Sequence, residues 1–318
     1  MKHIKVLPLL LTMFLSACLK DGSPLTNRFF CFDTMVYMSL YDSTRNNIED
    51  LDSLFRQYDK LCDNYEERDI TNVYSLNKTN EEVTVSEELY ELLSVSLNVK
   101  NEGATYFNPL CGSLAKKWKE AINNQQILDE ITKNEEISKI NNSELLLKEN
   151  NVVQRIGDAE IDLGAIAKGY VLDKAFDYLK EKNITNFMVD AGSSSVLLGE
   201  KKTGNGYFTV GLKDIDSAYF KAKNCFISTS GLSEQGVTIN GKRYSHIVNP
   251  ITGSAESQYN TVIVISNKGY YGDAMSTSLM MNTINEIKQI EQEHNIQTLV
   301  IKDNKIVYCN EGIEVLYH

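Results

Sequence analysis

The stretch Glu160-Ile161-Asp162-Leu163-Gly164-Ala165-Ile166-Ala167-Lys168-Gly169-Tyr170 predicts a glycine-containing turn that leads into a helix. The helix is expected from about Ala165 to Lys180, because apolar residues recur on one side of it, at Val171, Leu172, Ala175 and Leu179. Its first turn would offer free backbone N–H groups beside Lys168, which suits an anion such as phosphate. It is not a Walker A loop, since Gly169 and Tyr170 follow the lysine. The alternative is a strand-to-helix turn with a surface lysine.

The rest of the chain mixes strands and helices without strict alternation. Strands are expected over 32–41, 187–190, 196–198, 207–212, 225–229, 261–266, 298–301 and 305–309, with a hairpin around Asn240-Gly241. An amphipathic helix is expected over 48–61, a second helix starts at Ser86, and polar residues 119–150 predict a peripheral helical insertion. These patterns favour the α+β class.

A second cluster is Gly272-Asp273-Ala274-Met275-Ser276-Thr277. On a helix, the oxygens of Asp273, Ser276 and Thr277 would lie on one face. A carboxylate with hydroxyls is a set of hard oxygen ligands that suits Mg²⁺. The alternative is that Asp273 caps the start of a helix, since Asp is a favoured N-cap residue.

A third cluster joins Ser228-Thr229-Ser230-Gly231 to a later stretch, Tyr244-Ser245-His246-Ile247-Val248-Asn249-Pro250. Beyond the N-terminal segment the chain has histidine only at positions 246, 294 and 318. Because position 294 lies in a polar helical stretch, a catalytic histidine would be His246. A lone histidine is more often structural, and that alternative stays open.

Together, the three clusters resemble motifs of the FAD:protein FMN transferase (ApbE-like) family. The family's DLGGIAKGY resembles 162–170, its TSG and HIIDPRTG resemble 229–231 and 246–253, and its ADALAT resembles 272–277, with Gly272 and Ser276 as departures. Phe107-Asn108-Pro109 and Gly112 resemble FNPT-x-GPL, and Trp118 matches the aromatic residue that closes that motif. Phe32-Asp33-Thr34 stands where the family often has Met-Gly-Thr, and 190–193 where it has Asn-Ala-Gly-Gly. The resemblance covers nearly all of the chain after its N-terminal segment.

The resemblance implies a T-fold-like α+β domain with mixed or antiparallel sheets and flanking helices. Members transfer FMN from FAD to a Thr or Ser hydroxyl of another exported protein and release AMP. By similarity, Mg²⁺ would be held by Asp273, Thr277 and the Ala165 carbonyl, with Ser276 close by. Residues implied in FAD binding are Lys168, Asp162, Phe32, Tyr65, Phe107, Asn108 and Ile247. His246 is the candidate general base, or it organises the turn on which it lies.

Three alternatives to a transferase remain. The first is a Mg²⁺-dependent FAD pyrophosphatase, in which water attacks and FMN and AMP leave. The residue near Tyr65 influences that choice in the family, and Asn64 is adjacent to it here. The second is a lipoprotein that binds flavin without turning it over. The third is an unrelated surface lipoprotein.

The N-terminus resembles a bacterial lipoprotein signal. Lys2 and Lys5 precede an apolar run over 6–15, and Leu15-Ser16-Ala17-Cys18 resembles a lipobox. We expect residues 1–17 to be a signal peptide, Cys18 to carry a lipid, residues 18–27 to form a tether, and residues 28–318 to form the catalytic domain. The protein would then be anchored to a membrane and face the periplasm or outer surface. An ordinary signal peptide is the alternative; the apolar run is too short to span a bilayer.

Charge and cysteine content narrow the range of partners. The formal net charge is −11, which argues against nucleic acid as a partner. Besides Cys18 there are five cysteines, none in a CxxC arrangement. This content signals neither a disulfide framework nor a zinc site, and we expect mostly buried thiols.

Overall fold

The computed structural model describes residues 23–232, 236–239 and 241–318. The expected signal peptide, Cys18 with its expected lipid, residues 19–22 of the expected tether and Asn240 of the expected hairpin turn lie outside the described residues. Among the described helices, none combines the length and the apolar composition that crossing a bilayer requires.

The described helices are α1 (Arg45–Cys62), α2 (Val73–Asn77), α3 (Glu87–Asn101), α4 (Gly112–Asn123), α5 (Glu130–Asn141), α6 (Ala167–Glu181), α7 (Gly269–Leu279) and α8 (Ile284–His294). The strands of the largest sheet are β1 (Leu25–Cys31), β2 (Thr34–Leu40), β6 (Phe187–Ala191), β7 (Ser195–Leu198), β10 (Cys225–Gly231), β13 (Thr261–Ser266), β14 (Gln297–Lys302) and β15 (Lys305–Cys309). The smaller sheets contain β3 (Glu82–Thr84), β4 (Glu144–Lys148), β5 (Val152–Ile156), β8 (Phe208–Gly211), β9 (Ala218–Ala222), β11 (Gly236–Ile239), β12 (Lys242–Ser245) and β16 (Val315–Tyr317).

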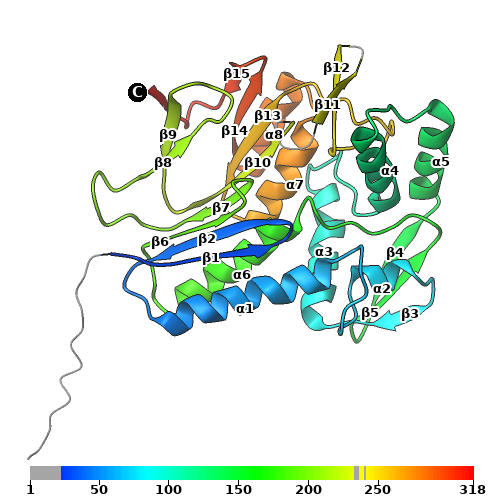
Figure 1. Cartoon of the computed structure of the whole chain (residues 1–318), viewed down its shortest axis with the longest axis horizontal. Coiled ribbons are helices and arrows are strands. Elements are labelled where there is room, and N and C mark those ends of the chain that lie inside the picture. The colour runs from blue at the N-terminus through cyan, green and yellow to red at the C-terminus, as the bar shows by residue number, and fades with distance from the viewer. Residues whose placement is uncertain (1–22, 233–235, 240) are drawn as a thin grey trace, which may run out of the picture.

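The eight-stranded sheet is the central layer (Figure 1). Its strands follow the order β1-β2-β6-β7-β10-β13-β14-β15, and every neighbouring pair is antiparallel. Successive side chains of β10 point to opposite faces, so Phe226 joins the core on one side and Ile227 a second core on the other. The sheet is therefore buried on both faces along its centre.

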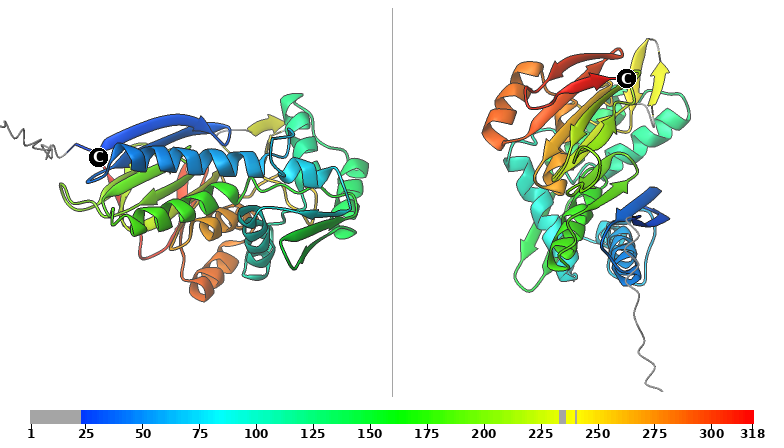
Figure 2. Two further views of the ribbon diagram at one scale, coloured as in Figure 1. Left: turned by 90° about the horizontal axis from the view of Figure 1, so that it is seen from below. Right: turned by 90° about the vertical axis from the view of Figure 1, so that its left-hand side faces the viewer.

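The two faces carry different partners. Helices α1, α6, α7 and α8 contribute to the larger core, while the small sheet β16-β9-β8 contributes Phe220 and Ala222 to the second core. Figure 2 shows α1 and α6 running side by side along the sheet. This arrangement confirms the expected α+β class with antiparallel sheets and flanking helices.

Most expected elements from residue 187 onward are present with small shifts of their ends. The expected first strand over 32–41 is present as β2, shortened to Thr34–Leu40, because Phe32-Asp33 form a turn in which both residues have φ above 50°. Strand β1, which pairs with β2 across this turn, was not expected. As a consequence, residues 25–27 of the expected tether belong to β1. The polar region 119–150 contains the end of α4, all of α5 and β4, so it is only partly helical.

Candidate functional site

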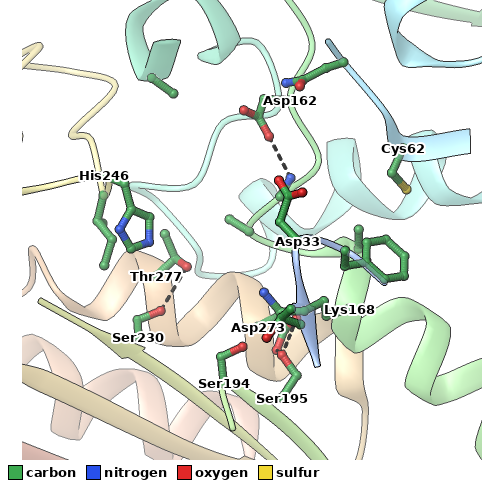
Figure 3. Close-up of a pocket in the computed structure, with 18 of the residues that line it drawn as sticks. Asp33, Cys62, Asp162, Lys168, Ser194, Ser195, Ser230, His246, Asp273 and Thr277 are labelled. Carbon is green, nitrogen blue, oxygen red and sulfur yellow. Dashed lines mark hydrogen bonds between the residues drawn. The ribbon is translucent and has the colours of Figure 1, made fainter. Parts of the chain in front are cut away.

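A cleft of about 720 Å³ opens between the tip of the β1–β2 hairpin, the start of α6 and the middle of α7 (Figure 3). Its volume lies within the range of sites that take drug-sized ligands and cofactors. Every site residue predicted in the described part of the chain lines it, namely Phe32, Tyr65, Phe107, Asn108, Asp162, Ala165, Lys168, His246, Ile247, Asp273, Ser276 and Thr277. The structure therefore brings together residues that are up to 245 positions apart in the chain.

Asp273 carries the one buried carboxylate among the described residues that line the cleft. It is 6% exposed, and its carboxylate accepts hydrogen bonds from Ser195 Oγ (2.8 Å), Ser228 Oγ (2.7 Å) and the Gly169 N–H (2.6 Å). Burial raises the pKa of this carboxyl above its ordinary value, and the charge of Lys168 and the three donors oppose that rise. Asp273 lies inside α7, whose N-cap is Lys268, so the alternative that Asp273 is an N-cap is excluded.

The crossing of α6 and α7 brings Asp273 to Gly169. A Cβ on Gly169 would overlap the Gly269 carbonyl oxygen, and a Cβ on Gly269 would overlap the Gly169 carbonyl oxygen. Asp173 of α6 strengthens the same contact, because its carboxylate accepts from the Gly269 and Tyr270 N–H groups at 2.9 and 2.8 Å. Burial raises the pKa of Asp173 to about 6. The two helices are thus joined through backbone atoms and two buried carboxylates, those of Asp173 and Asp273.

The same arrangement leaves the Ala165 carbonyl available. The Gly169 N–H, which a continuous helix would direct to Ala165, donates to Asp273 instead, and no other described residue donates to this carbonyl. A carboxylate, a main-chain carbonyl and the Thr277 hydroxyl are oxygen donors of the kind that Mg²⁺ prefers. The described residues contain no group of three or more His, Cys, Asp and Glu side chains that could hold a metal. The available donors therefore fit a hard cation that keeps part of its water shell.

Ser276 is less available than Thr277. Its buried hydroxyl contacts the Asp273 carbonyl oxygen at 3.0 Å and Ser230 Oγ at 2.9 Å. Thr277 Oγ1 also lies 3.1 Å from Ser230 Oγ, and Figure 3 shows this pair on the floor of the cleft. The hydroxyl at position 276, a departure from the family motif, thus extends a chain of hydroxyl groups beside Asp273.

Three of the predicted free N–H groups at the start of α6 are taken up, while the Lys168 N–H has no partner among the described residues. Ile166 and Ala167 both donate to the Leu163 carbonyl, at 3.0 and 2.8 Å, and the Gly169 N–H is bound to Asp273. The tight turn before the helix causes this, because it supplies acceptors that a free helix N-terminus lacks. An anion at this place would therefore have the Lys168 ammonium, which lines the cleft next to Asp273 (Figure 3), and one main-chain N–H rather than a whole helix turn.

Asp162 shapes the loop that leads to Lys168. Its carboxylate accepts from the Gly164 N–H at 2.7 Å, an Asx-type turn, and its own N–H donates to the Pro109 carbonyl at 2.8 Å. Asn108 forms the same kind of turn, since its side-chain oxygen accepts a hydrogen bond from the Leu110 N–H. The carboxylate of Asp162 remains half-buried at the cleft wall, where it can accept further hydrogen bonds.

Apolar side chains form other parts of the wall. Phe107 and Ile247 are buried, and Phe32 is half-buried on the hairpin tip. Tyr65 lies at the rim and is 51% exposed, with its ring 5.0 Å from Lys116 Nζ and 4.9 Å from Lys119 Nζ. The neighbouring Asn64 is buried and also lines the cleft.

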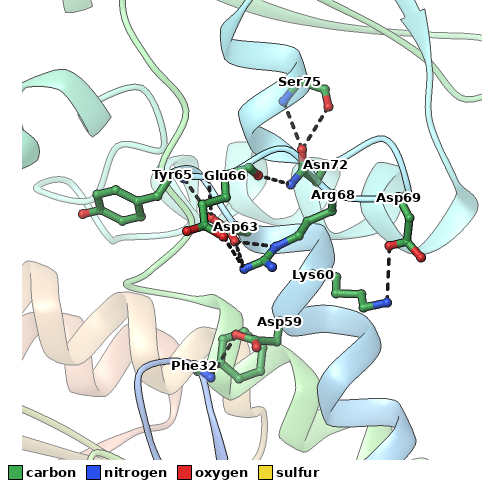
Figure 4. A network of polar contacts seen from close by, with 10 residues as sticks. All are labelled: Phe32, Asp59, Lys60, Asp63, Tyr65, Glu66, Arg68, Asp69, Asn72 and Ser75. Carbon is green, nitrogen blue, oxygen red and sulfur yellow. Dashed lines mark hydrogen bonds and ion pairs between the residues drawn. The ribbon is translucent and has the colours of Figure 1, made fainter.

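Asp63 fixes the loop that carries Tyr65 (Figure 4). Its carboxylate accepts from the N–H groups of Tyr65 and Glu66, at 2.8 and 3.0 Å, and from Arg68 Nε at 2.8 Å. Although partial burial raises the pKa of Asp63, these hydrogen bonds and the Arg68 charge outweigh it and the net shift is downward. Figure 4 shows the Tyr65 ring projecting away from this network. The hydrogen bonds and ion pair of Asp63 therefore fix the loop that places the Tyr65 ring at the entrance of the cleft.

His246 lies on the loop after β12, exposed at the cleft wall (Figure 3). Trp118 of α4 supports this loop: its Nε1 donates to the Gly253 carbonyl at 2.7 Å, and its ring stacks on Tyr244. His246 is thus part of a well-supported turn and also accessible from the cleft. Both predicted roles remain compatible with this position.

Sequence reasoning did not assign roles to three groups in the site. Ser195 and Ser228 donate to Asp273 from β7 and β10, where they are cross-strand neighbours. Polar residues inside otherwise apolar strands were the available signal. Asp33 lines the cleft with φ of 54°, and a non-glycine residue at a position where the family often has glycine was a second signal.

The cleft thiols are inert. All five cysteines of the described region are free, and Cys62 and Cys111 line the cleft. Burial raises the pKa of Cys111 to about 12 and raises that of Cys62 as well. Neither thiol is therefore a nucleophile at neutral pH.

Comparison with known proteins identifies the family. The sequence model described as "ApbE family" matches residues 32–300. The chain belongs to the ApbE family. An ApbE-family relative from Klebsiella pneumoniae (strain 342), named FAD:protein FMN transferase, is 26% identical over 235 residues, 70% of this chain and 72% of that protein. Another of that name from Treponema pallidum (strain Nichols) is 25% identical over 253 residues, 73% of this chain and 70% of that protein.

Solved ApbE structures share the fold. The crystal structure of the ApbE protein of Thermotoga maritima superposes with a TM-score of 0.76 at 24% identity, covering 92% of this chain and 96% of that one. The flavin transferase ApbE from Vibrio cholerae gives a TM-score of 0.74 at 18% identity, covering 91% and 97%. The ApbE fold thus extends over nearly the whole described chain.

Proposed function

We propose that this protein transfers FMN from FAD to a Thr or Ser hydroxyl of an exported acceptor protein, in a Mg²⁺-dependent reaction that releases AMP. The observation that carries the proposal is the buried Asp273 carboxylate beside Lys168 and the free Ala165 carbonyl, in a cleft of about 720 Å³. Family membership and the names of the relatives support the same reaction class.

The donor set supports a cation at this end of the cleft. Asp273, Thr277 and the Ala165 carbonyl would hold Mg²⁺, with Ser276 close by. When bound, the cation would neutralise charge on the pyrophosphate oxygens. Because Ser195 and Ser228 donate to Asp273 through rotatable hydroxyl groups, they can keep its orientation while it accepts a further partner.

The protein side chains account for binding and proton transfer. Lys168 would bind a pyrophosphate oxygen, and Asp162 an amine or hydroxyl group of the adenosine part. The acceptor oxygen forms a bond to the phosphorus of the FMN phosphate, and the bond from that phosphorus to the bridging oxygen breaks, so AMP leaves with the electron pair. His246 would take the proton of the acceptor hydroxyl. Phosphoryl transfer depends mainly on such positioning and charge neutralisation.

One assay tests the reaction. The purified protein is incubated with FAD and Mg²⁺, with and without Thr-containing peptides, and AMP and covalently bound flavin fluorescence are measured. Transfer predicts AMP together with flavin-labelled peptide. AMP with free FMN and no labelled peptide would replace transfer by pyrophosphatase activity, and FAD binding without AMP would leave a flavin-binding protein.

We also propose that Cys18 carries a lipid and that the domain faces the periplasm or the outer surface. The proposal rests on the Leu15-Ser16-Ala17-Cys18 sequence after a short apolar run. FAD and the acceptor would then both be outside the cytoplasm. Expression with a radiolabelled fatty acid should label the protein but not Cys18→Ala, whereas equal labelling of the two would contradict the proposal.

A further inference from the structure

The strand β1 is an exposed edge next to the cleft. It is the outermost strand of the eight-stranded sheet, and among the described strands it pairs with β2 alone. Edge strands carry main-chain groups that can pair with another chain, and proteins usually protect them. The β1–β2 hairpin ends at Phe32 and Asp33, both of which line the cleft. An extended segment paired with β1 would therefore end near the site.

The outward-facing N–H groups of β1 differ in their protection. The two-residue turn makes Cys31 and Thr34 a bonded pair, so alternate residues of β1 point their main-chain groups away from β2. The outward Arg28 N–H donates to Asn27 Oδ1, and the Phe32 N–H donates to Asp59 Oδ1, both at 2.9 Å. Between them, the Phe30 N–H has no partner among the described residues. The edge is thus protected on both sides of Phe30 and open at Phe30.

An apolar pair lies at the same place. Phe30 is 61% exposed and its cross-strand neighbour Met35 is 39% exposed. Phe30 also lines the cleft, so the exposed apolar surface continues into the site. Most of the other large side chains of β1 and β2, such as Phe29 and Met38, are buried. Leu25 at the far end of the hairpin is also exposed, at 38%, but only the cleft end carries an exposed cross-strand apolar pair.

We propose that an extended segment of the acceptor protein pairs with β1 at Phe30, forming a β-bridge that brings its hydroxyl residue to the cleft. The proposal rests on the transferase function proposed above, which requires a polypeptide segment at this entrance. Main-chain pairing together with a pocket for alternate side chains is a common mode of peptide recognition. Phe30 is two residues from Phe32, about 7 Å along an extended strand. A residue one or two positions beyond the bridge would thus reach the cleft mouth.

The occupant is expected to be a polypeptide because of the groups that are available. A free N–H and C=O with a flat apolar surface match an extended main chain, whereas a phosphate or a lipid headgroup would need clustered cations, and Arg28 is the only cationic residue of β1 and β2. A second copy of this chain could pair edge to edge in the same way. That outcome is separated from acceptor binding by the experiment below.

The experiment first selects a peptide. Short peptides with one central Thr are immobilised on beads, treated with the native protein, FAD and Mg²⁺, and the beads that become fluorescent are sequenced. The selected peptide is resynthesised with each backbone amide methylated in turn. We expect one methylated position near the Thr to lower kcat/KM about tenfold, as loss of a bridging hydrogen bond would do, with little effect of methylation at the adjacent positions. Equal effects at all positions would overturn the β-bridge.

The protein side is tested with a matched pair of variants. Phe30→Pro removes the open N–H at an edge position that tolerates proline, and Arg28→Pro removes an N–H that is already satisfied by Asn27. At saturating FAD, we expect Phe30→Pro to raise the KM for the peptide about tenfold and Arg28→Pro to change it less than about twofold. Equal values for the two variants would overturn the inference.

Two further outcomes are decisive. If the native protein is a dimer in light scattering, and Phe30→Pro is monomeric with unchanged peptide kinetics, the edge serves self-association and the inference is wrong. If AMP and FMN form but no bead becomes fluorescent, the transferase function fails and the inference fails with it. If beads become fluorescent but Phe30→Pro and Arg28→Pro give equal KM values, the transferase function stands and only the β-bridge is wrong.

Discussion

Gly169 and Gly269 pack so closely that neither can carry a side chain without a collision with the other's carbonyl oxygen. The contact sets the crossing of α6 and α7 and directs the Gly169 N–H to the Asp273 carboxylate at 2.6 Å. The packing of two glycines therefore determines where the central carboxylate of the cleft lies.

Gly169→Ala is expected to lower the free energy of unfolding by about 3 kcal/mol, because the added methyl group must push the helices apart. It should also reduce turnover in the fraction that remains folded, since a Cβ would lie 2.8 Å from Asp273 Cγ. Urea denaturation measures the first effect. Gly211→Ala is the control, because its Cβ meets nothing within 4 Å, and it should change stability by less than about 0.5 kcal/mol. Equal effects of the two substitutions would contradict the account.

Gly272 departs from the family motif because two serine hydroxyl groups occupy the space of a Cβ. A Cβ here would lie 2.7 Å from Ser266 Oγ and 2.8 Å from Ser228 Oγ, and Ser228 also donates to Asp273. Restoring the family residue with Gly272→Ala should cost about 1–2 kcal/mol of unfolding free energy. In a background with Ser228→Ala and Ser266→Ala the cost should fall by about 1 kcal/mol. Denaturation of the four proteins measures this coupling, and additive changes would speak against it.

Asp173 should make stability depend on pH. Its pKa is about 6 in the folded protein and near 3.8 when unfolded, so between these values the folded state binds more protons. The contribution of Asp173 to the free energy of unfolding should therefore be highest below about pH 4. It should fall by up to about 3 kcal/mol as the pH rises through 6. Asp173→Asn should remove this slope in urea denaturation, and Asp177→Asn, an exposed residue on the same helix, should keep it. An unchanged slope in Asp173→Asn would show that other groups cause it.

Lys168 should contribute to FAD binding through its charge. Lys168→Gln is expected to raise the dissociation constant of FAD about tenfold at low salt, and less at high salt, where screening already weakens the ion pair. Flavin fluorescence titration measures both conditions. Lys174→Gln on the same helix is the control, because Lys174 pairs with Glu91 at 2.7 Å, and its effect should stay within about twofold. A salt-independent effect of Lys168→Gln would indicate a structural role.

The sequence predicted the chemistry-bearing residues better than their partners. Asp273 and Thr277 could be placed together because helical spacing fixes their relation. The donors Ser195 and Ser228 come from two strands, and their opposition depends on strand register, which no local pattern reveals. The free N–H groups expected beside Lys168 were predicted only in part for a related reason, since the turn before α6 takes up those of Ile166 and Ala167 and the Asp273 carboxylate takes up that of Gly169.

The fold likewise has strands that the sequence predicts and strands that it does not. Strands β10 and β13 were predicted well because β-branched and aromatic residues are enriched in strands. Strand β1 was missed as a whole, because its start at Leu25–Asn27 resembles a tether and an edge strand can be polar. The small sheet of β3, β4 and β5 was missed as well, since short strands around Asn-rich turns lack a clear alternation.

The origin of the oxygen atoms in the products tests the central claim most directly. The protein, FAD, Mg²⁺ and the selected Thr peptide are incubated in ¹⁸O-labelled water, and AMP, FMN and the labelled peptide are examined by mass spectrometry, with Asp273→Asn alongside. We predict equal amounts of AMP and flavinylated peptide, no ¹⁸O in either, and at least about a hundredfold slower reaction in Asp273→Asn. The central claim would be contradicted if free FMN or AMP carrying ¹⁸O formed in place of flavinylated peptide. Full activity of Asp273→Asn would contradict it as well.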